Sequence, residues 1–119
     1  MTRAEVDALC AAHPGAVLSG QGELDAWKVG GKMFASFSGE GRGDPVEGGH
    51  ATGVSVKCLD VETAHMLIES GIARRAPYFH RSWVRVPFEG TAPEEAAHRI
   101  AVSYDTVAAG LPRRVREAL

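Results

Sequence analysis

The sequence predicts an α+β fold, a two-layer sandwich in which an antiparallel sheet of about five strands carries three helices on one face. The first observation is the order of the segments, helix, three or four strands, helix, strand, helix, because strands in runs between helices favour an antiparallel sheet. The second is the pair Gly30-Gly31 between two extended segments, since glycine tolerates the positive φ of a hairpin turn. The third is the length of 119 residues, which suits one core, so residues 1–119 are expected to form a single domain. The sheet face without helices would be open to solvent or to a partner.

Three helices are indicated by apolar residues at helical spacing between recognisable caps and stops. The apolar stripes are Val6, Leu9, Cys10 and His13 in the first, Val61, Ala64, Leu67 and Ile68 in the second, and Ala97, Ile100, Ala101, Tyr104, Ala108 and Leu111 in the third. The first helix is capped by Thr2 with Glu5 and ends at Pro14-Gly15, and the second is capped by Asp60 and ends at Gly71. The third is capped by Thr91 with Glu94 and ends at Gly110. The basic end of the chain, RRVREAL, is expected to be a frayed turn.

Extended segments are predicted from apolar alternation at residues 16–19, 24–29, 33–37, 54–58 and 83–88. In the third of them, strict alternation would place Met33, Ala35 and Phe37 on one face and Phe34 and Ser36 on the other. The glycine-rich residues 38–53 lack periodicity and are expected to be a loop inside the one domain.

The composition, 45% hydrophobic and 24% charged, is that of an ordinary globular protein. The formal net charge of −2 counts against a strong, non-specific nucleic-acid binder, so any contact with nucleic acid must be local. The N-terminus lacks the apolar region of a signal peptide, and no apolar run approaches the ~20 residues that span a bilayer. We therefore expect a cytoplasmic protein without membrane contact, a monomer rather than an obligate oligomer, in which Cys10 and Cys58 are free.

No arrangement of catalytic or metal-binding residues is recognisable in the sequence. None of the five histidines has a second histidine within one helical turn, so no metal site is expected. No serine or cysteine lies in a nucleophile motif, and the glycines of residues 38–53 match neither a P-loop nor a dinucleotide fingerprint. We therefore expect a protein that is not an enzyme and has no cofactor.

One stretch, RRAPYFHRSWVRVPF, combines positive charge with flat rings and contains no acidic residue. Nucleic-acid surfaces use this combination, because arginines bind phosphates while aromatic faces stack on bases. The residues concerned are Arg74, Arg75, Arg81 and Arg85 with Tyr78, Phe79, His80 and Trp83, and the patch would be extended by Lys28, Lys32 and Lys57 if these lie on the same face. On these residues alone, a buried Phe79 and Trp83 with a solvated arginine rim is the better-supported interpretation.

Four segments, WKVGGKMFASF, KCLDVETAHMLIESG, APYFHRSWVRV and RIAVSYDTVAAGLPRR, resemble in order and spacing the conserved blocks of the MmcQ/YjbR-like proteins. The opening RAEVDALCAAHPGA is similar to the first helix of that family, so the resemblance covers nearly the whole chain. It implies a fold similar to the CyaY-like (frataxin) and secretion-chaperone-like architectures. It also implies DNA binding through a "double wing" of β-hairpins, the function predicted for the family.

The resemblance places the first wing at residues 27–37 and the second at residues 77–86. The DNA-binding residues it implies are Lys28 and Lys32 in the first wing and His80, Arg81, Trp83 and Arg85 in the second, with Arg74 and Arg75 beside them. The chain departs from the family pattern at SGQGELDA and in the long loop that carries Glu40, Asp44 and Glu47, and both changes make the first wing more acidic.

Two hypotheses follow. The first is a non-enzymatic DNA-binding module that contacts phosphates through the two wings. The alternative is a domain that binds a protein partner or a small ligand on the open sheet face, also without catalysis. The direction of the arginines and lysines distinguishes them, since a shared face favours nucleic acid and scattered positions favour the alternative.

Overall fold

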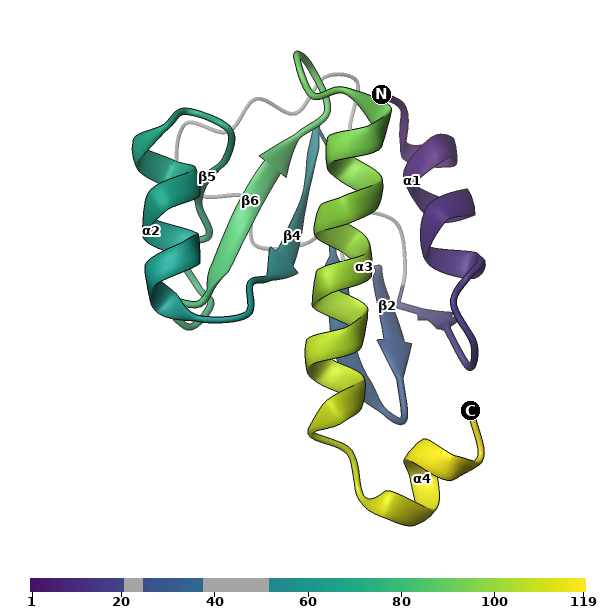
Figure 1. The fold of residues 1–119 in the computed structure, drawn as a ribbon. Helices are drawn as coiled ribbons and strands as arrows, with labels where there is room; N and C mark the ends of the chain where they lie inside the picture. Colours follow the sequence, from purple (N-terminus) through teal and green to yellow (C-terminus); the bar gives the residue numbers. More distant parts are fainter. Residues whose placement is uncertain (21–24, 38–51) are drawn as a thin grey trace.

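The computed structural model describes residues 1–20, 25–37 and 52–119, and within these ranges it contains four helices and six strands (Figure 1). The helices are α1 (Arg3–Ala11), α2 (Val61–Glu69), α3 (Pro93–Ala109) and α4 (Arg113–Glu117). The strands are β1 (Val17–Ser19), β2 (Ala26–Val29), β3 (Lys32–Ser36), β4 (Gly53–Lys57), β5 (Arg74–Arg75) and β6 (Trp83–Pro87). Residues 38–51 of the predicted loop, with Glu40, Asp44 and Glu47, and Leu24 of a predicted strand lie outside the described residues.

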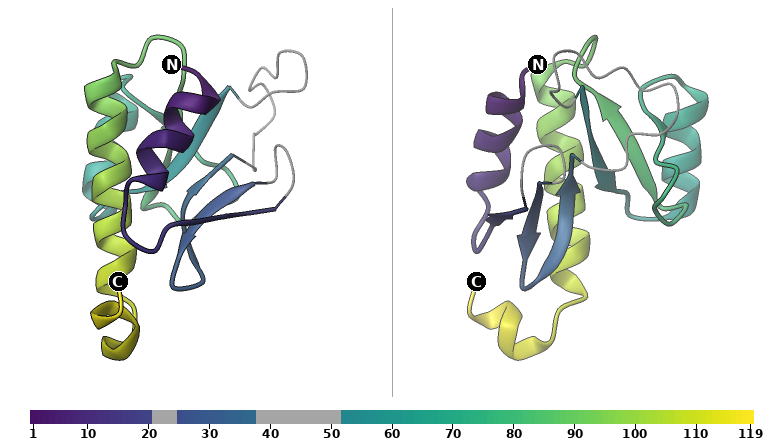
Figure 2. Two further views of the ribbon diagram at one scale, coloured as in Figure 1. Left: turned by 90° about the vertical axis from the view of Figure 1, so that its right-hand side faces the viewer. Right: turned by 180° about the vertical axis from the view of Figure 1, so that it is seen from behind.

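The six strands form one sheet in the order β1-β2-β3-β4-β6-β5, and every neighbouring pair is antiparallel. Figure 2 shows α1, α2 and α3 on one side of this sheet, with α3 crossing its middle. The predicted α+β architecture with helices on one face is confirmed. The sheet has one strand more than predicted, because the two residues of β5 pair with β6 at the sheet edge. No helix among the described residues is long and apolar enough to cross a bilayer.

Two of the three predicted helix caps are confirmed. The Thr2 hydroxyl accepts a hydrogen bond from the backbone N–H of Glu5, and the Asp60 carboxylate accepts one from the N–H of Thr63. The capping box predicted at Thr91 is wrong. The third helix begins one residue later, with Pro93 in its first turn, and the Thr91 hydroxyl instead donates to the carbonyl of Pro87. Proline is favoured at the first helical position because its fixed φ suits the helix and its missing N–H has no partner to lose there.

The strict alternation predicted for β3 is also wrong, because the strand contains a bulge at Phe34. Trp27 pairs with Ala35 and Lys28 with Met33, which leaves Phe34 unpaired between them. Phe34 and Ala35 are therefore both buried in the core beneath the helices, and the Phe34 ring meets that of Tyr104 edge-on at 5.3 Å.

Ser103 of α3 joins β3 and β4 where their pairing stops. Its buried hydroxyl donates to the carbonyl of Phe34 and accepts from the N–H of Lys57 at 2.9 Å. These two backbone groups would face each other if the β3–β4 ladder continued past Ala35 and Val56. The serine hydroxyl satisfies both groups, and it anchors α3 across the middle of the sheet.

Candidate nucleic-acid interface

The two turns that the resemblance identifies as wings lie at the same end of the sheet. β3 runs away from the Gly30-Gly31 turn and β4 returns toward it, so that β4 ends at Lys57 close to the turn. Trp83 pairs with Lys57 at the start of β6, which brings the segment before Trp83 to that end as well. Figure 1 shows the end of β4 next to the start of β6, with the β2–β3 turn below them.

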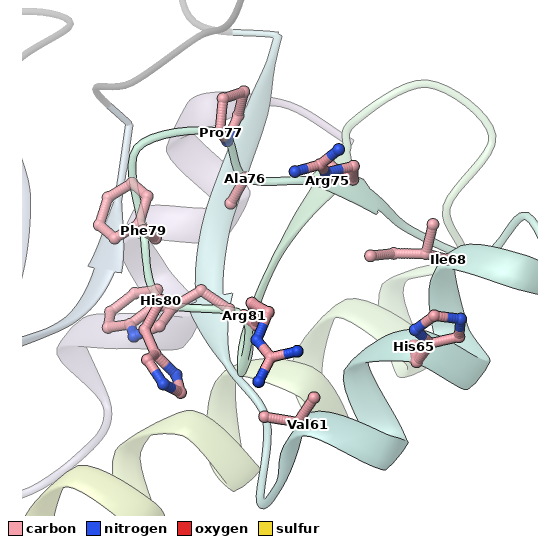
Figure 3. Close-up of a pocket in the computed structure, with 10 residues that line it drawn as sticks. Val61, His65, Ile68, Arg75, Ala76, Pro77, Phe79, His80 and Arg81 are labelled. Carbon is pink, nitrogen blue, oxygen red and sulfur yellow. The ribbon is translucent and has the colours of Figure 1, made fainter.

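A shallow depression of about 400 Å³ lies between the first turn and the start of β6. Its lining comes from four elements and consists of Lys32, Met33, Lys57, Trp83, Thr106, Val107, Gly110 and Leu111. A second pocket, of about 310 Å³, lies between α2 and the segment that leads into β6 (Figure 3). The two depressions share Trp83 in their lining, and we treat them together as one candidate surface. We call its charged and ring-bearing part the turn-end surface, made up of Lys32, Met33, Lys57, Arg75, Phe79, His80, Arg81 and Trp83.

Five of the eight residues implied by the resemblance belong to the turn-end surface, namely Lys32, Arg75, His80, Arg81 and Trp83. Trp83 is half-buried and the other four are exposed. Lys28 is half-buried in β2, and Arg74 is exposed on β5; neither lines the two depressions.

The structure buries Arg85, which the resemblance implies as a binding residue. Its side chain is 2% exposed, and its guanidinium donates to the carbonyl of Ser36 at 3.4 Å and to the hydroxyl of Ser55 at 3.3 Å. The unpredicted strand β5 pairs with the outer side of β6 through Arg74 and Arg85. β6 is therefore an interior strand, and a side chain at its centre lies among neighbours on both sides.

Three cations of the turn-end surface, Lys32, Arg75 and Arg81, have exposed side chains. Among the ion pairs between residues that the structure describes, none involves Lys32, Arg75 or Arg81. Lys57 donates to the hydroxyl of Ser82 at 2.8 Å, a neutral partner, and no ion pair within residues 1–20, 25–37 and 52–119 involves it.

A chain of hydrogen bonds holds the second turn in place. The hydroxyl of Ser82 accepts a hydrogen bond from Lys57 Nζ and lies 2.9 Å from Nδ1 of His80. That nitrogen also accepts a hydrogen bond from the backbone N–H of Ser82. The carbonyl of His80 accepts the N–H of Trp83 at 2.9 Å. The rings of Phe79 and Trp83 stack with their centroids 4.7 Å apart. The predicted burial of these two rings is only partial, because both remain half-exposed.

Sequence reasoning missed the role of the C-terminal segment, which was predicted to be a frayed turn. It forms α4, and Leu111 and Val115 pack against Gly30 of the first turn; a Cβ added there would lie 2.7 Å from Leu111 Cδ1. This contact brings the arginines of α4 next to the turn-end surface; they are Arg113, Arg114 and Arg116, of which Arg113 is paired with Glu117. The only local signal was one apolar residue, Val115, among charged ones.

Neither a metal-ligand cluster nor an activated thiol is found among the described residues. No three His, Cys, Asp or Glu side chains of the described ranges converge as metal ligands. Cys10 and Cys58 are free and buried, and burial raises the pKa of the Cys10 thiol to about 12. A thiol with so high a pKa is protonated near neutral pH, and therefore a poor nucleophile.

Comparison with solved structures gives a similar fold in a Deinococcus radiodurans protein, DR2400, described by the domain name DUF419. The TM-score is 0.75 with 19% sequence identity, and the match covers 98% of this chain and 86% of that one. No match was found among curated proteins. The sequence model of the YjbR family matches residues 11–106, which include both turns and β6. This match confirms the resemblance, and the chain belongs to the YjbR family.

Proposed function

We propose that the turn-end surface binds DNA by contacting its phosphates, and that the protein acts as a non-enzymatic binding module. The observation that carries the proposal is the convergence of the two turns at one end of the sheet, where exposed cations lie beside half-exposed aromatic rings.

The cations come from separate elements, and they are therefore spread along the surface rather than clustered. Lys32 lies in β3, Lys57 ends β4, Arg75 lies in β5 and Arg81 lies in the turn before β6. A phosphate backbone presents charges at regular intervals, so a row of separated cations suits it better than a single cluster does. The arginines of α4 would lengthen this row at the first turn.

The alternative, a protein or ligand site on the open sheet face, has less support. The centre of that face is occupied by Ser36, Ser55 and Arg85, and none of them is more than 2% exposed. The Arg85 guanidinium donates to the Ser55 hydroxyl and to the backbone carbonyl of Ser36, and the three side chains present little contact area to a partner.

The proposal is tested by titrating a labelled mixed-sequence duplex with the protein at several salt concentrations and following fluorescence anisotropy. We expect the logarithm of the binding constant to fall linearly with that of the salt concentration, by about 0.9 for each phosphate neutralised. Arg81→Ala should weaken binding and lower this slope by about 1.

The matched control is Ala4→Glu, which changes the net charge by the same amount in the first turn of the exposed face of α1, at the opposite end of the molecule (Figure 1). We expect this variant to bind DNA like the unmodified protein. Absence of binding at low salt, or equal losses in the two variants, would contradict the proposal.

A further inference from the structure

We infer that the pocket between α2 and the second turn holds one unpaired base, so that the protein prefers DNA with an unpaired nucleotide over a blunt duplex. This inference rests on the proposed function and adds to it the form of the ligand. The pocket has a volume of about 310 Å³, which lies at the lower end of the range for small-molecule sites, about 300–1,000 Å³. A space of this size suits a single flat ring system rather than an extended cofactor.

The walls of the pocket are apolar and aromatic. Val61 and Ile68 contribute from α2, and Pro77, Phe79 and Trp83 contribute from the opposite side. A third flat ring could extend the stack of Phe79 on Trp83, because both rings are half-exposed. Stacking on aromatic side chains accepts any base, since every base has a π-face.

The polar residues that line the pocket favour an anion next to the ring. Figure 3 shows the guanidinium group of Arg81 on the side of the turn that faces α2, and Arg75 above it. Both side chains are exposed, and neither takes part in an ion pair between described residues. His65 contributes little positive charge, because Glu69 pairs with it at 3.0 Å. A flat ring that carries an adjacent phosphate satisfies both halves of this lining.

Base pairing decides which DNA can use the pocket. In a duplex both faces of each base are covered by the neighbouring bases, and taking a base out of the stack costs free energy. A single-stranded overhang supplies a free base without that cost. Trp83 lines both the pocket and the neighbouring depression, so an overhang could enter the pocket while the duplex stays on Lys32 and Lys57.

The test compares a blunt duplex with the same duplex carrying a short single-stranded overhang, each titrated with the protein at fixed salt. We expect the overhang to bind about 10-fold more tightly, the size of one stacking contact. Phe79→Ala should weaken binding of the overhang more than binding of the blunt duplex, and so remove this preference. Tyr78→Ala is the matched control, because Tyr78 is the neighbouring aromatic residue, is 77% exposed and does not line the pocket.

A second variant and a second signal guard against misfolding. Val61→Phe narrows the pocket from α2 without altering the turn, and should also remove the preference. Binding of the overhang should quench the fluorescence of Trp83 selectively. The other tryptophan, Trp27, is only 8% exposed, and its indole N–H donates a hydrogen bond to the Asp7 carboxylate. The far-ultraviolet circular dichroism spectrum of each variant verifies its folding.

Equal affinity for the two DNAs, or an equal loss in Phe79→Ala and Tyr78→Ala, would overturn the inference while the proposed DNA binding stands. Quenching of Trp83 by an acidic peptide but by neither DNA would also overturn it and would assign the pocket to proteins. If neither DNA binds at low salt, the proposed function itself fails.

Discussion

At the scale of single residues, Arg81 and Arg85 are two arginines four positions apart that lie in different environments, one exposed and one buried. Arg81 lies in a turn and is exposed. Arg85 lies in an interior strand, is buried, and donates hydrogen bonds to the Ser36 carbonyl and the Ser55 hydroxyl. A basic residue near a predicted site is therefore a candidate ligand only if its position in the sheet leaves it at the surface.

We predict that Arg85→Ala lowers the stability of the fold and that Arg81→Ala does not. Removing the Arg85 guanidinium leaves the Ser36 carbonyl and the Ser55 hydroxyl without this donor in a buried site, where an unsatisfied group costs about 1–3 kcal/mol. The free energy of unfolding in urea should fall by about 2 kcal/mol or more for Arg85→Ala, and by less than about 0.5 kcal/mol for Arg81→Ala. An Arg85→Ala protein with unchanged stability but weaker DNA binding would restore Arg85 as a ligand.

At the scale of elements, the contact between α4 and the first turn positions the basic C-terminal segment. Gly30 and Gly31 both have positive φ, at 56° and 80°, which favours glycine at either position. Only Gly30 lies against α4: a Cβ there would come within 3.0 Å of Leu111 and Val115, whereas a Cβ at Gly31 would meet nothing within 4 Å.

This difference makes Gly30→Ala and Gly31→Ala a matched pair. Both should lose about 1–2 kcal/mol because alanine disfavours positive φ. Gly30→Ala should lose about 1–3 kcal/mol more through overpacking and should displace α4. Urea denaturation measures the stability, and limited trypsin digestion measures the release of α4, which has cleavage sites at Arg113, Arg114 and Arg116. Equal digestion of the two variants would show that α4 does not depend on this contact.

The same elements explain what could be predicted from sequence. The hairpin at Gly30-Gly31 and the cap at Asp60 depend on residues a few positions apart, and both were predicted correctly. β5 has two residues and exists only because β6 pairs with it. The docking of α4 joins residues 30 and 111, a contact that no local pattern can reveal. For that reason the hairpin was predicted, while the burial of Arg85 and the contact of α4 with the first turn were not.

At the scale of the whole molecule, the net charge of −2 conceals an uneven distribution. The first turn, with Lys32, and α4, with Arg113, Arg114 and Arg116, lie at the lower end of the molecule, and α3 begins with Glu94 and Glu95 at the upper end (Figure 1). A protein that is slightly negative as a whole can therefore orient one positive end toward a polyanion, because at ordinary salt a charge acts over about 10 Å.

This polarity predicts that the protein is retained on a phosphocellulose column at neutral pH in spite of its net negative charge. A triple variant with Lys32→Ala, Arg81→Ala and Arg114→Ala should elute without added salt, because it loses cations at the positive end only. A second triple variant, with Ala4→Glu, Ala8→Glu and Ala92→Asp at exposed positions on α1 and before α3, has the same formal charge of −5 but should still be retained. The salt concentration at elution measures the difference, and the comparison separates local from total charge because the two variants match in net charge. If both variants elute together, total charge governs the behaviour of the protein, and the positive end has no separate effect on binding to polyanions.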